Sequence, residues 1–176
     1  MVPIVGRSGI DDAARIRLAE GATMIDTTKG FTLVRTYPAT PEQIFTAWTD
    51  ADAISQWWHP RGATTPRDAV AVDPQVGGRY TYTMVNEDTG DRVVTAGIYR
   101  ELTANERLVF TWGEPDGDPE ATPVVTITLE PSSESKSVSA GTRLTFDLRG
   151  VEGSAGDGFF YDGWDSALDS LGDYLA

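Results

Sequence analysis

The fold is decided by the closing stretch of the sequence, GDGFFYDGWDSALDSLGDYLA, at residues 156–176. Its large apolar side chains recur every three or four residues, which is the period of a helix with one buried face. They are Phe160, Trp164, Leu168, Leu171 and Leu175. Aspartates occupy the opposite side. A helix with such an apolar face needs an apolar partner, and we predict that it packs against one face of a sheet.

The sheet is predicted from the middle of the chain, where a period of two replaces the helical period. An alternating strand, FTLVRTY at residues 31–37, precedes six more strand-like runs with turn signals between them. These runs cover residues 69–72, 78–85, 93–102, 107–112, 124–129 and 142–148. The connections NEDTG and TANE are too short for parallel crossovers, so we expect an antiparallel meander. Gly77 and Gly78 predict a bulge or sharp bend that curves this sheet.

Two short helices are predicted after the first strand. Thr40, Pro41 and Gln43 match a capping box with proline at the first helical position. Asp50 is a second N-cap, and Pro60 ends the helix that follows it, since a residue before proline avoids the helical region. Each helix carries apolar residues at helical spacing, namely Ile44, Ala47 and Trp48 in the first and Ile54, Trp57 and Trp58 in the second. The predicted fold class is therefore α+β.

Length and composition favour one domain. The 176 residues are 40% hydrophobic and include five tryptophans, enough for a sizeable core without disulfides. We assign residues 31–176 to this domain and residues 1–30 to an N-terminal extension, with a short helix from Asp11 or Asp12 to Glu20. Neither a signal peptide nor a membrane span is recognisable, so a cytoplasmic location is expected.

Charge and cysteine content narrow the function classes. The formal net charge of -13 disfavours nucleic acid and anionic membranes as partners. The absence of cysteine removes thiolate nucleophiles, disulfides and Cys-type zinc sites. The acidic loop with Glu114, Asp116, Asp118 and Glu120 lacks the ligand order of an EF-hand, so we expect a solvated turn and no metal or other cofactor.

Six stretches follow one another in a specific order between residues 31 and 176. They are PEQIFTAWTD, QWWHPRG, VGGRYTYTM, GIYRELTANERLVFTW, GTRLTF and GWDSALDSLGDYL. In this order they resemble the activator of heat-shock-protein-90 ATPase homologue family, a branch of the START-like (SRPBCC) superfamily that includes polyketide cyclases. The resemblance implies a helix-grip fold, in which a curved antiparallel sheet wraps the long C-terminal helix and leaves an apolar cavity. The full-length co-chaperone has a separate N-terminal chaperone-binding domain, for which residues 1–30 are too few, so ATPase activation is not expected.

Inward-facing aromatic side chains are the candidates for lining that cavity. We expect only one of Trp57 and Trp58 to reach it, because an aromatic residue on the apolar face of a helix is usually part of the core. Two inward tyrosine hydroxyls would need hydrogen-bond partners, which a ligand or water could supply. The candidate cavity residues are Trp58, Tyr80, Tyr82, Met84, Phe110, Trp112, Phe146, Phe160 and Trp164.

His59 is the one candidate catalytic residue, since its near-neutral pKa suits a general acid or base. It has no orienting partner visible in the sequence, and we expect it at the solvent or at the cavity rim. Three functions remain open: binding of a small apolar or aromatic ligand, with a link to stress as one variant; a co-chaperone-like interaction protein with a chaperone as partner; and a cyclase, dehydratase or hydrolase acting in the cavity. A monomer or a homodimer is expected.

Overall fold

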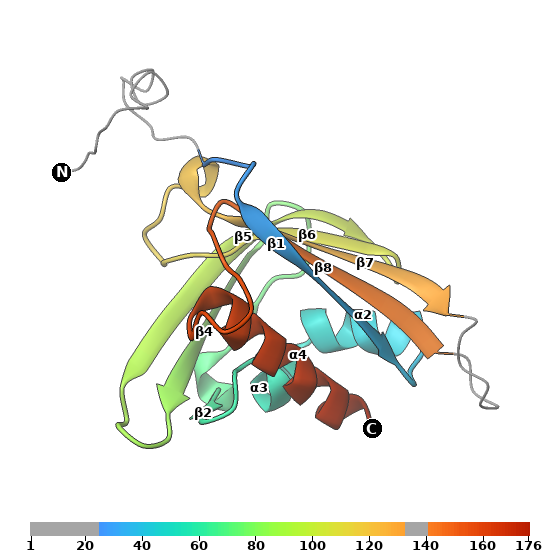
Figure 1. Ribbon diagram of the computed structural model, residues 1–176, viewed down its shortest axis with the longest axis horizontal. Helices are drawn as coiled ribbons and strands as arrows, with labels where there is room; N and C mark the ends of the chain where they lie inside the picture. The colour runs from blue at the N-terminus through green and yellow to red at the C-terminus, as the bar shows by residue number, and fades with distance from the viewer. Residues whose placement is uncertain (1–24, 133–140) are drawn as a thin grey trace.

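A curved antiparallel sheet wraps around the C-terminal helix in the computed structural model, which describes residues 25–132 and 141–176 (Figure 1). The strands are β1 (Gly30–Tyr37), β2 (Ala63–Thr64), β3 (Ala71–Val72), β4 (Arg79–Asn86), β5 (Arg92–Thr103), β6 (Arg107–Thr111), β7 (Val124–Ser132) and β8 (Gly141–Arg149). Their order is β1-β8-β7-β6-β5-β4-β2, and β3 also pairs with β4. All pairs are antiparallel, and β1 joins the sheet beside the last strand.

Three α-helices of the described segments lie on the concave side of the sheet: α2 (Pro41–Thr49), α3 (Ala51–Trp57) and α4 (Phe160–Leu175). The predicted capping box is confirmed, because Thr40 accepts from the backbone of Gln43 and the Gln43 side chain accepts from the backbone of Thr40. Asp50 caps α3 by accepting from Ala53 N at 3.0 Å. Two 3-10 turns, η2 (Arg67–Ala69) and η3 (Pro119–Ala121), interrupt the connections. No helix among the described residues is long and apolar enough to cross a membrane.

Two details of the predicted sheet differ from the structure. The run at 69–72 begins as the end of η2, and only its last two residues form β3, while β2 was not predicted because two residues carry no periodicity. Gly77 and Gly78 form a turn before β4, and the register shift lies across from them in β5, between Tyr99 and Glu101. Gly77 N donates to Tyr99 O at 2.8 Å, so the turn and the bulge form one bend. The helix predicted at residues 11–20 lies outside the described residues.

The core lies between the sheet and the helices and is rich in aromatic rings. Trp48 is its centre, with ring centroids 4.6 Å from Trp57, 5.2 Å from Trp58 and 6.2 Å from Trp164. The α4 face predicted from the sequence is buried at Trp164, Leu168 and Leu171, and partly buried at Phe160 and Leu175. This helix therefore closes the core, as its apolar period predicts.

Candidate functional site

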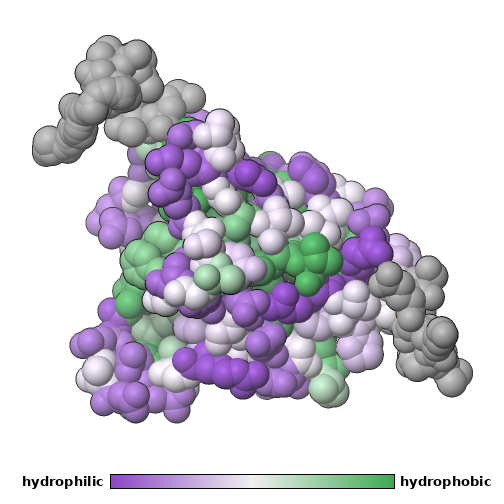
Figure 2. All heavy atoms as spheres, viewed as in Figure 1, coloured by the Kyte–Doolittle hydropathy of each residue, from purple (hydrophilic) through white to green (hydrophobic). Residues whose placement is uncertain are grey.

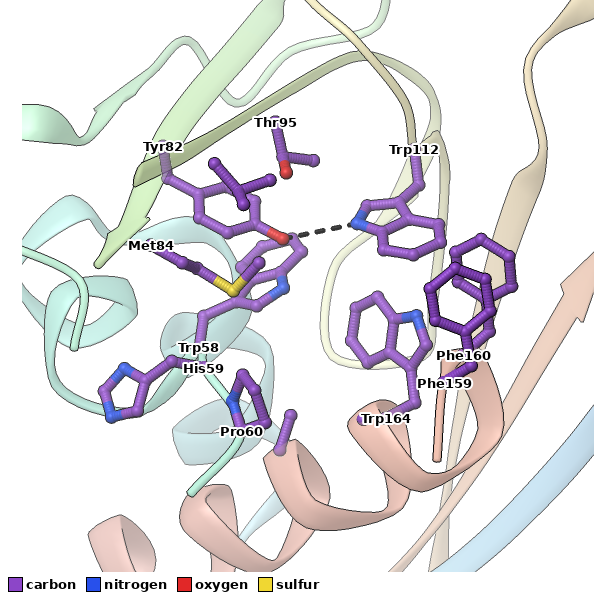
Figure 3. A pocket seen from close by; sticks show the side chains of 13 residues that line it. Trp58, His59, Pro60, Tyr82, Met84, Thr95, Trp112, Phe159, Phe160 and Trp164 are labelled. Atoms are coloured by element: carbon purple, nitrogen blue, oxygen red, sulfur yellow. Dashed lines mark hydrogen bonds between the residues drawn. The ribbon is translucent and has the colours of Figure 1, made fainter. Parts of the chain in front are cut away.

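An apolar pocket of about 280 Å³ opens beside the first turns of α4, between this helix, the β4–β5 hairpin and the end of α3 (Figure 3). Six of the nine predicted cavity residues line it: Trp58, Tyr82, Met84, Trp112, Phe160 and Trp164. Figure 3 shows their rings and the Met84 side chain surrounding one space, with Trp112 and Tyr82 above it and α4 below. The pocket is thus formed by residues that lie far apart in the sequence.

The other three predicted cavity residues do not line this pocket, which corrects the sequence interpretation. Tyr80, Phe110 and Phe146 are buried in the core behind it. Tyr80 stacks against Trp58 at 5.6 Å, and its hydroxyl donates to Thr111 O at 2.6 Å. The protein backbone therefore supplies the partner that we expected from a ligand or water. Trp57 also stays in the core, where Nε1 donates to Ala47 O at 2.8 Å.

Several lining residues were missed because they are small or polar. Thr95 pairs with Tyr82 across β4 and β5, so the cross-strand register would have identified it. Gly163 and Ala167 lie three and seven residues after Phe160, on the same face of α4. At Gly163 an added Cβ would meet no atom within 4 Å. Small residues on this face leave the room that the pocket occupies.

Exposed apolar side chains stand at the mouth of the pocket. Phe159 is 68% exposed and Val93 55% exposed, and both line the opening. Figure 2 shows apolar surface over the region where α4 begins, surrounded by more polar surface. The pocket is therefore reached from solvent across an apolar rim.

Tyr82 and Trp112 carry a hydrogen bond inside the pocket, from Trp112 Nε1 to Tyr82 Oη at 3.2 Å (Figure 3). Burial raises the pKa of Tyr82, although the nearby polar groups of Trp112, Thr95 and Trp58 oppose the rise, so the hydroxyl stays protonated at neutral pH. The indole N–H groups of Trp58 and Trp164 are buried and have no hydrogen-bond partner among the described residues. Trp48 Nε1 and Tyr99 Oη are in the same situation within the core.

His59 lies at the rim, and its ring points away from the space between Trp58 and Trp164 (Figure 3). Thr65 Oγ1 donates to Trp58 O at 2.9 Å, so the same hydroxyl must accept from His59 Nδ1, 3.1 Å away. This fixes the proton of the neutral imidazole on Nδ1. Burial lowers the pKa of His59, while Glu87 opposes the shift. Thr65 is the orienting partner that sequence reasoning missed.

The loop that leads into α4 is held by two carboxylates. Asp157 accepts from the backbone N–H groups of Phe159, Tyr161 and Asp162 at 2.8, 3.2 and 3.2 Å. Asp162 accepts in turn from Gly158 N at 2.7 Å. Desolvation raises the pKa of Asp157, but the backbone hydrogen bonds together outweigh it and lower the pKa. These bonds fix the position of Phe159 at the mouth.

The described residues contain no cluster of three or more His, Asp or Glu side chains that could hold a metal ion. The lining of the pocket likewise includes no lysine, arginine, aspartate or glutamate among those residues. Its chemistry is that of apolar contact with a few hydrogen-bond groups, and it offers no charged partner for an ionic ligand.

Comparison with known proteins places the chain in a family. The family model described as "Activator of Hsp90 ATPase homolog 1-like protein" matches residues 38–176. The chain belongs to this family. The resemblance found in the sequence is thereby confirmed, and no curated protein matches the sequence significantly.

Solved structures that are similar to this chain share its fold. A crystal structure from Chromobacterium violaceum is 26% identical, with a TM-score of 0.68 over 84% of this chain and 97% of that chain. An AHSA1 protein from Silicibacter pomeroyi is 27% identical, with a TM-score of 0.62 over 83% of this chain and 96% of that chain. An Hsp90 activator from Plasmodium falciparum is 23% identical, with a TM-score of 0.50 over 72% of this chain and 76% of that chain, a likeness of fold alone. The predicted α+β helix-grip fold is confirmed.

Proposed function

We propose that the protein binds a small apolar or aromatic molecule in the pocket between β4, β5 and α4. The observation that carries this proposal is the pocket itself, about 280 Å³ in volume and walled by Trp58, Tyr82, Trp112 and Trp164. Ligand sites are typically concave, mostly apolar and supplied with a few polar groups, and volumes begin at roughly 300 Å³. The size of this pocket suits a ligand of two or three fused rings.

Binding without turnover fits the polar groups at the site better than catalysis does. His59, the candidate general base, turns its ring away from the pocket interior, and its Nδ1 is hydrogen-bonded to Thr65 rather than to a carboxylate. Tyr82 is held protonated by burial, which suits hydrogen bonding more than proton abstraction. In the part of the chain that the structure describes, the enzyme alternative therefore has no base directed into the pocket.

The test uses Gly163, whose side-chain position faces open space at the pocket. A neutral fluorescent probe, N-phenyl-1-naphthylamine, is titrated into the protein and into two variants. Gly163→Leu fills the pocket and should weaken probe binding by about tenfold or more, while Gly163→Ala should bind within about twofold of the parent. Both variants improve helix propensity, by up to about 1 kcal/mol, and urea denaturation of each variant checks that a loss confined to leucine does not come from unfolding. Equal probe binding by all three proteins would refute the proposal.

A second candidate function is interaction with a chaperone. It is favoured by the family match over residues 38–176 and by the likeness of fold to a Plasmodium falciparum Hsp90 activator. The ATPase rate of purified Hsp90 is measured with and without this chain, using bovine serum albumin as a protein control. A saturable rise in rate that albumin does not give would support this candidate, and an unchanged rate at excess chain would reject it.

A further inference from the structure

Aromatic rings border the pocket on several sides. Six of its described lining side chains are aromatic, and none is a lysine or an arginine. The rings belong to Trp58, Tyr82, Trp112, Phe159, Phe160 and Trp164. Figure 3 shows Tyr82 and Trp58 on one side of the space, Trp112 and Phe160 on the other, and Trp164 below. A ligand in the pocket is therefore surrounded mainly by ring carbon.

The planes of neighbouring rings turn around this space instead of stacking. Trp112 meets Trp164 with ring centroids 5.3 Å apart and planes at 63°, and it meets Phe160 at 5.7 Å and 82°. The indole N–H of Trp164 is buried, so this ring presents carbon to the pocket. The face of an aromatic ring is its negative side and attracts a cation within about 6 Å of the centroid. A cation in this space is within reach of several rings at once.

The charges around the mouth also favour a cation. Every charged residue after Arg149 is acidic, including Asp157 and Asp162, which hold the loop that leads into α4. Arg61, next to the rim, pairs with Asp173 at 3.5 Å. Acidic residues also outnumber the one basic residue where β4 turns into β5, at Glu87, Asp88, Asp91 and Arg92. With a formal net charge of -13 for the chain, the field at the mouth attracts cations and repels anions.

The lining decides which kind of cation fits. Among the described residues it offers no carboxylate. A primary ammonium carries three N–H donors and loses its water on entering, so it needs acceptors that this lining lacks. A quaternary ammonium has no N–H group, and its methyl groups make apolar contact. Aromatic faces are the groups with which proteins recognise such ligands.

From these observations we infer that the ligand is a small molecule in which a quaternary ammonium group is joined to a short apolar body. The inference rests on the binding function proposed above and specifies the chemical class of its ligand. The ammonium group lies against Trp112 and Trp164, and the apolar body contacts Met84 and Val93. Attraction to the ring faces sets the preference, and apolar contact supplies most of the affinity.

The test measures how well three ligands that share a benzyl group displace N-phenyl-1-naphthylamine at neutral pH. They are benzyltrimethylammonium, its neutral isostere neopentylbenzene, and benzylammonium. Benzyltrimethylammonium should bind at least about threefold more tightly than the neutral isostere. It should bind at least about tenfold more tightly than benzylammonium, whose N–H groups find no carboxylate.

Two changes to the protein test the ring faces. Trp112→Leu should lower the ratio of benzyltrimethylammonium to neopentylbenzene affinity about threefold, because one ring is lost. Tyr161→Leu is the matched control and should leave this ratio unchanged. Tyr161 is also a half-buried aromatic residue, but it packs on Phe31 with ring centroids 5.0 Å apart and does not line the pocket. Protein made with 5-fluorotryptophan keeps every side-chain shape, and its ratio should fall because fluorine withdraws electron density from the ring faces.

The outcomes separate this inference from the binding proposal. If N-phenyl-1-naphthylamine does not bind the parent protein, pocket binding is refuted and the inference with it. If the probe and neopentylbenzene bind but benzyltrimethylammonium binds no more tightly, pocket binding stands and the cation is overturned. A ratio unchanged by fluorination would overturn the role of the ring faces, and a ratio unchanged in Trp112→Leu would overturn the position of the ammonium group.

A lipid headgroup is a second source of quaternary ammonium. Phosphatidylcholine carries a phosphate beside its ammonium group, which the acidic mouth disfavours. The protein should therefore not float with phosphatidylcholine vesicles in a density gradient. Flotation of the parent that Trp112→Leu abolishes would assign the site to the headgroup and overturn a free small molecule as its ligand.

Discussion

Trp57 and Trp58 stack with ring centroids 5.6 Å apart and planes 10° apart, yet only Trp57 has an acceptor for its indole N–H. That acceptor is Ala47 O, one of the last carbonyls of α2, which the helix itself leaves without a partner. Two neighbouring residues of the same type therefore have different roles. Trp57 joins α3 to the end of α2, and Trp58 forms a wall of the pocket.

This difference predicts unequal costs for the same substitution. Trp57→Phe removes a buried hydrogen bond and leaves Ala47 O unpaired, whereas Trp58→Phe removes a donor that has no acceptor. We expect Trp57→Phe to lower the free energy of unfolding by about 1–2 kcal/mol more than Trp58→Phe. Urea denaturation followed by circular dichroism measures both. Equal losses would show that the bond to Ala47 contributes nothing net.

Trp164 should be the most costly single truncation in α4. It is 4% exposed and contacts Trp48, Trp112 and Phe146, the last with ring centroids 4.5 Å apart. Trp164→Ala should lower the free energy of unfolding by about 3–5 kcal/mol. Tyr174→Ala, at an exposed position of the same helix, should stay within about 0.5 kcal/mol of the parent. A melting temperature of Trp164→Ala close to that of the parent would contradict the closing role of α4.

His59 should make stability depend on pH in a defined direction. Burial lowers its pKa in the folded state below 6.5, so the unfolded chain binds the proton first as the pH falls. The contribution of neutral His59 to the free energy of unfolding is complete above about pH 6.5. It is lost progressively at lower pH, until the histidine is protonated in the folded form too. In His59→Asn the decrease in unfolding free energy between pH 7.5 and pH 5.5 should be smaller. An identical decrease would show that acidic groups alone cause it.

Asp157 should control local order at the mouth of the pocket. Its carboxylate is the acceptor for the backbone N–H groups of Phe159, Tyr161 and Asp162. We expect Asp157→Ala to speed hydrogen exchange at these amides while the central strands exchange as in the parent. The pKa of Asp157 is lowered in the folded state. Its contribution to the stability of this loop is therefore present above the unfolded pKa, near 3.9, and is lost as the pH falls through the folded pKa. Unchanged exchange at Phe159 would rule out this role.

The sequence predicts those parts of the fold that depend on local pattern. The capping box at Thr40 and the apolar face of α4 are set by neighbours within four residues, and both agree with the structure. Alternation within β4 likewise predicts that Tyr80 and Tyr82 point inward. It cannot predict that only Tyr82 reaches the pocket, because that depends on where α4 crosses the sheet.

The missed features depend on contacts between segments. The bond from His59 to Thr65 crosses a loop without periodicity, so no pattern in the sequence marks it. The indole N–H of Trp58 has no acceptor because of the rings that surround it, and these come from distant parts of the sequence. Gly163 and Ala167 leave space by being small, and a small residue on a helix face is equally typical of close packing.

The pairing of β1 with β8 has a consequence for the order in which the chain assembles. Thr32 and Asp147, bonded across these strands at 2.8 Å, are 115 residues apart in sequence. During synthesis from the N-terminus, β1 leaves the ribosome before the other described strands, and its neighbour in the described sheet, β8, follows nearly last. Until then Phe31, Leu33 and Tyr37 have no sheet to cover them, and closing so long a loop slows folding. Until β8 is made, the nascent strand is therefore open to mispairing with other chains.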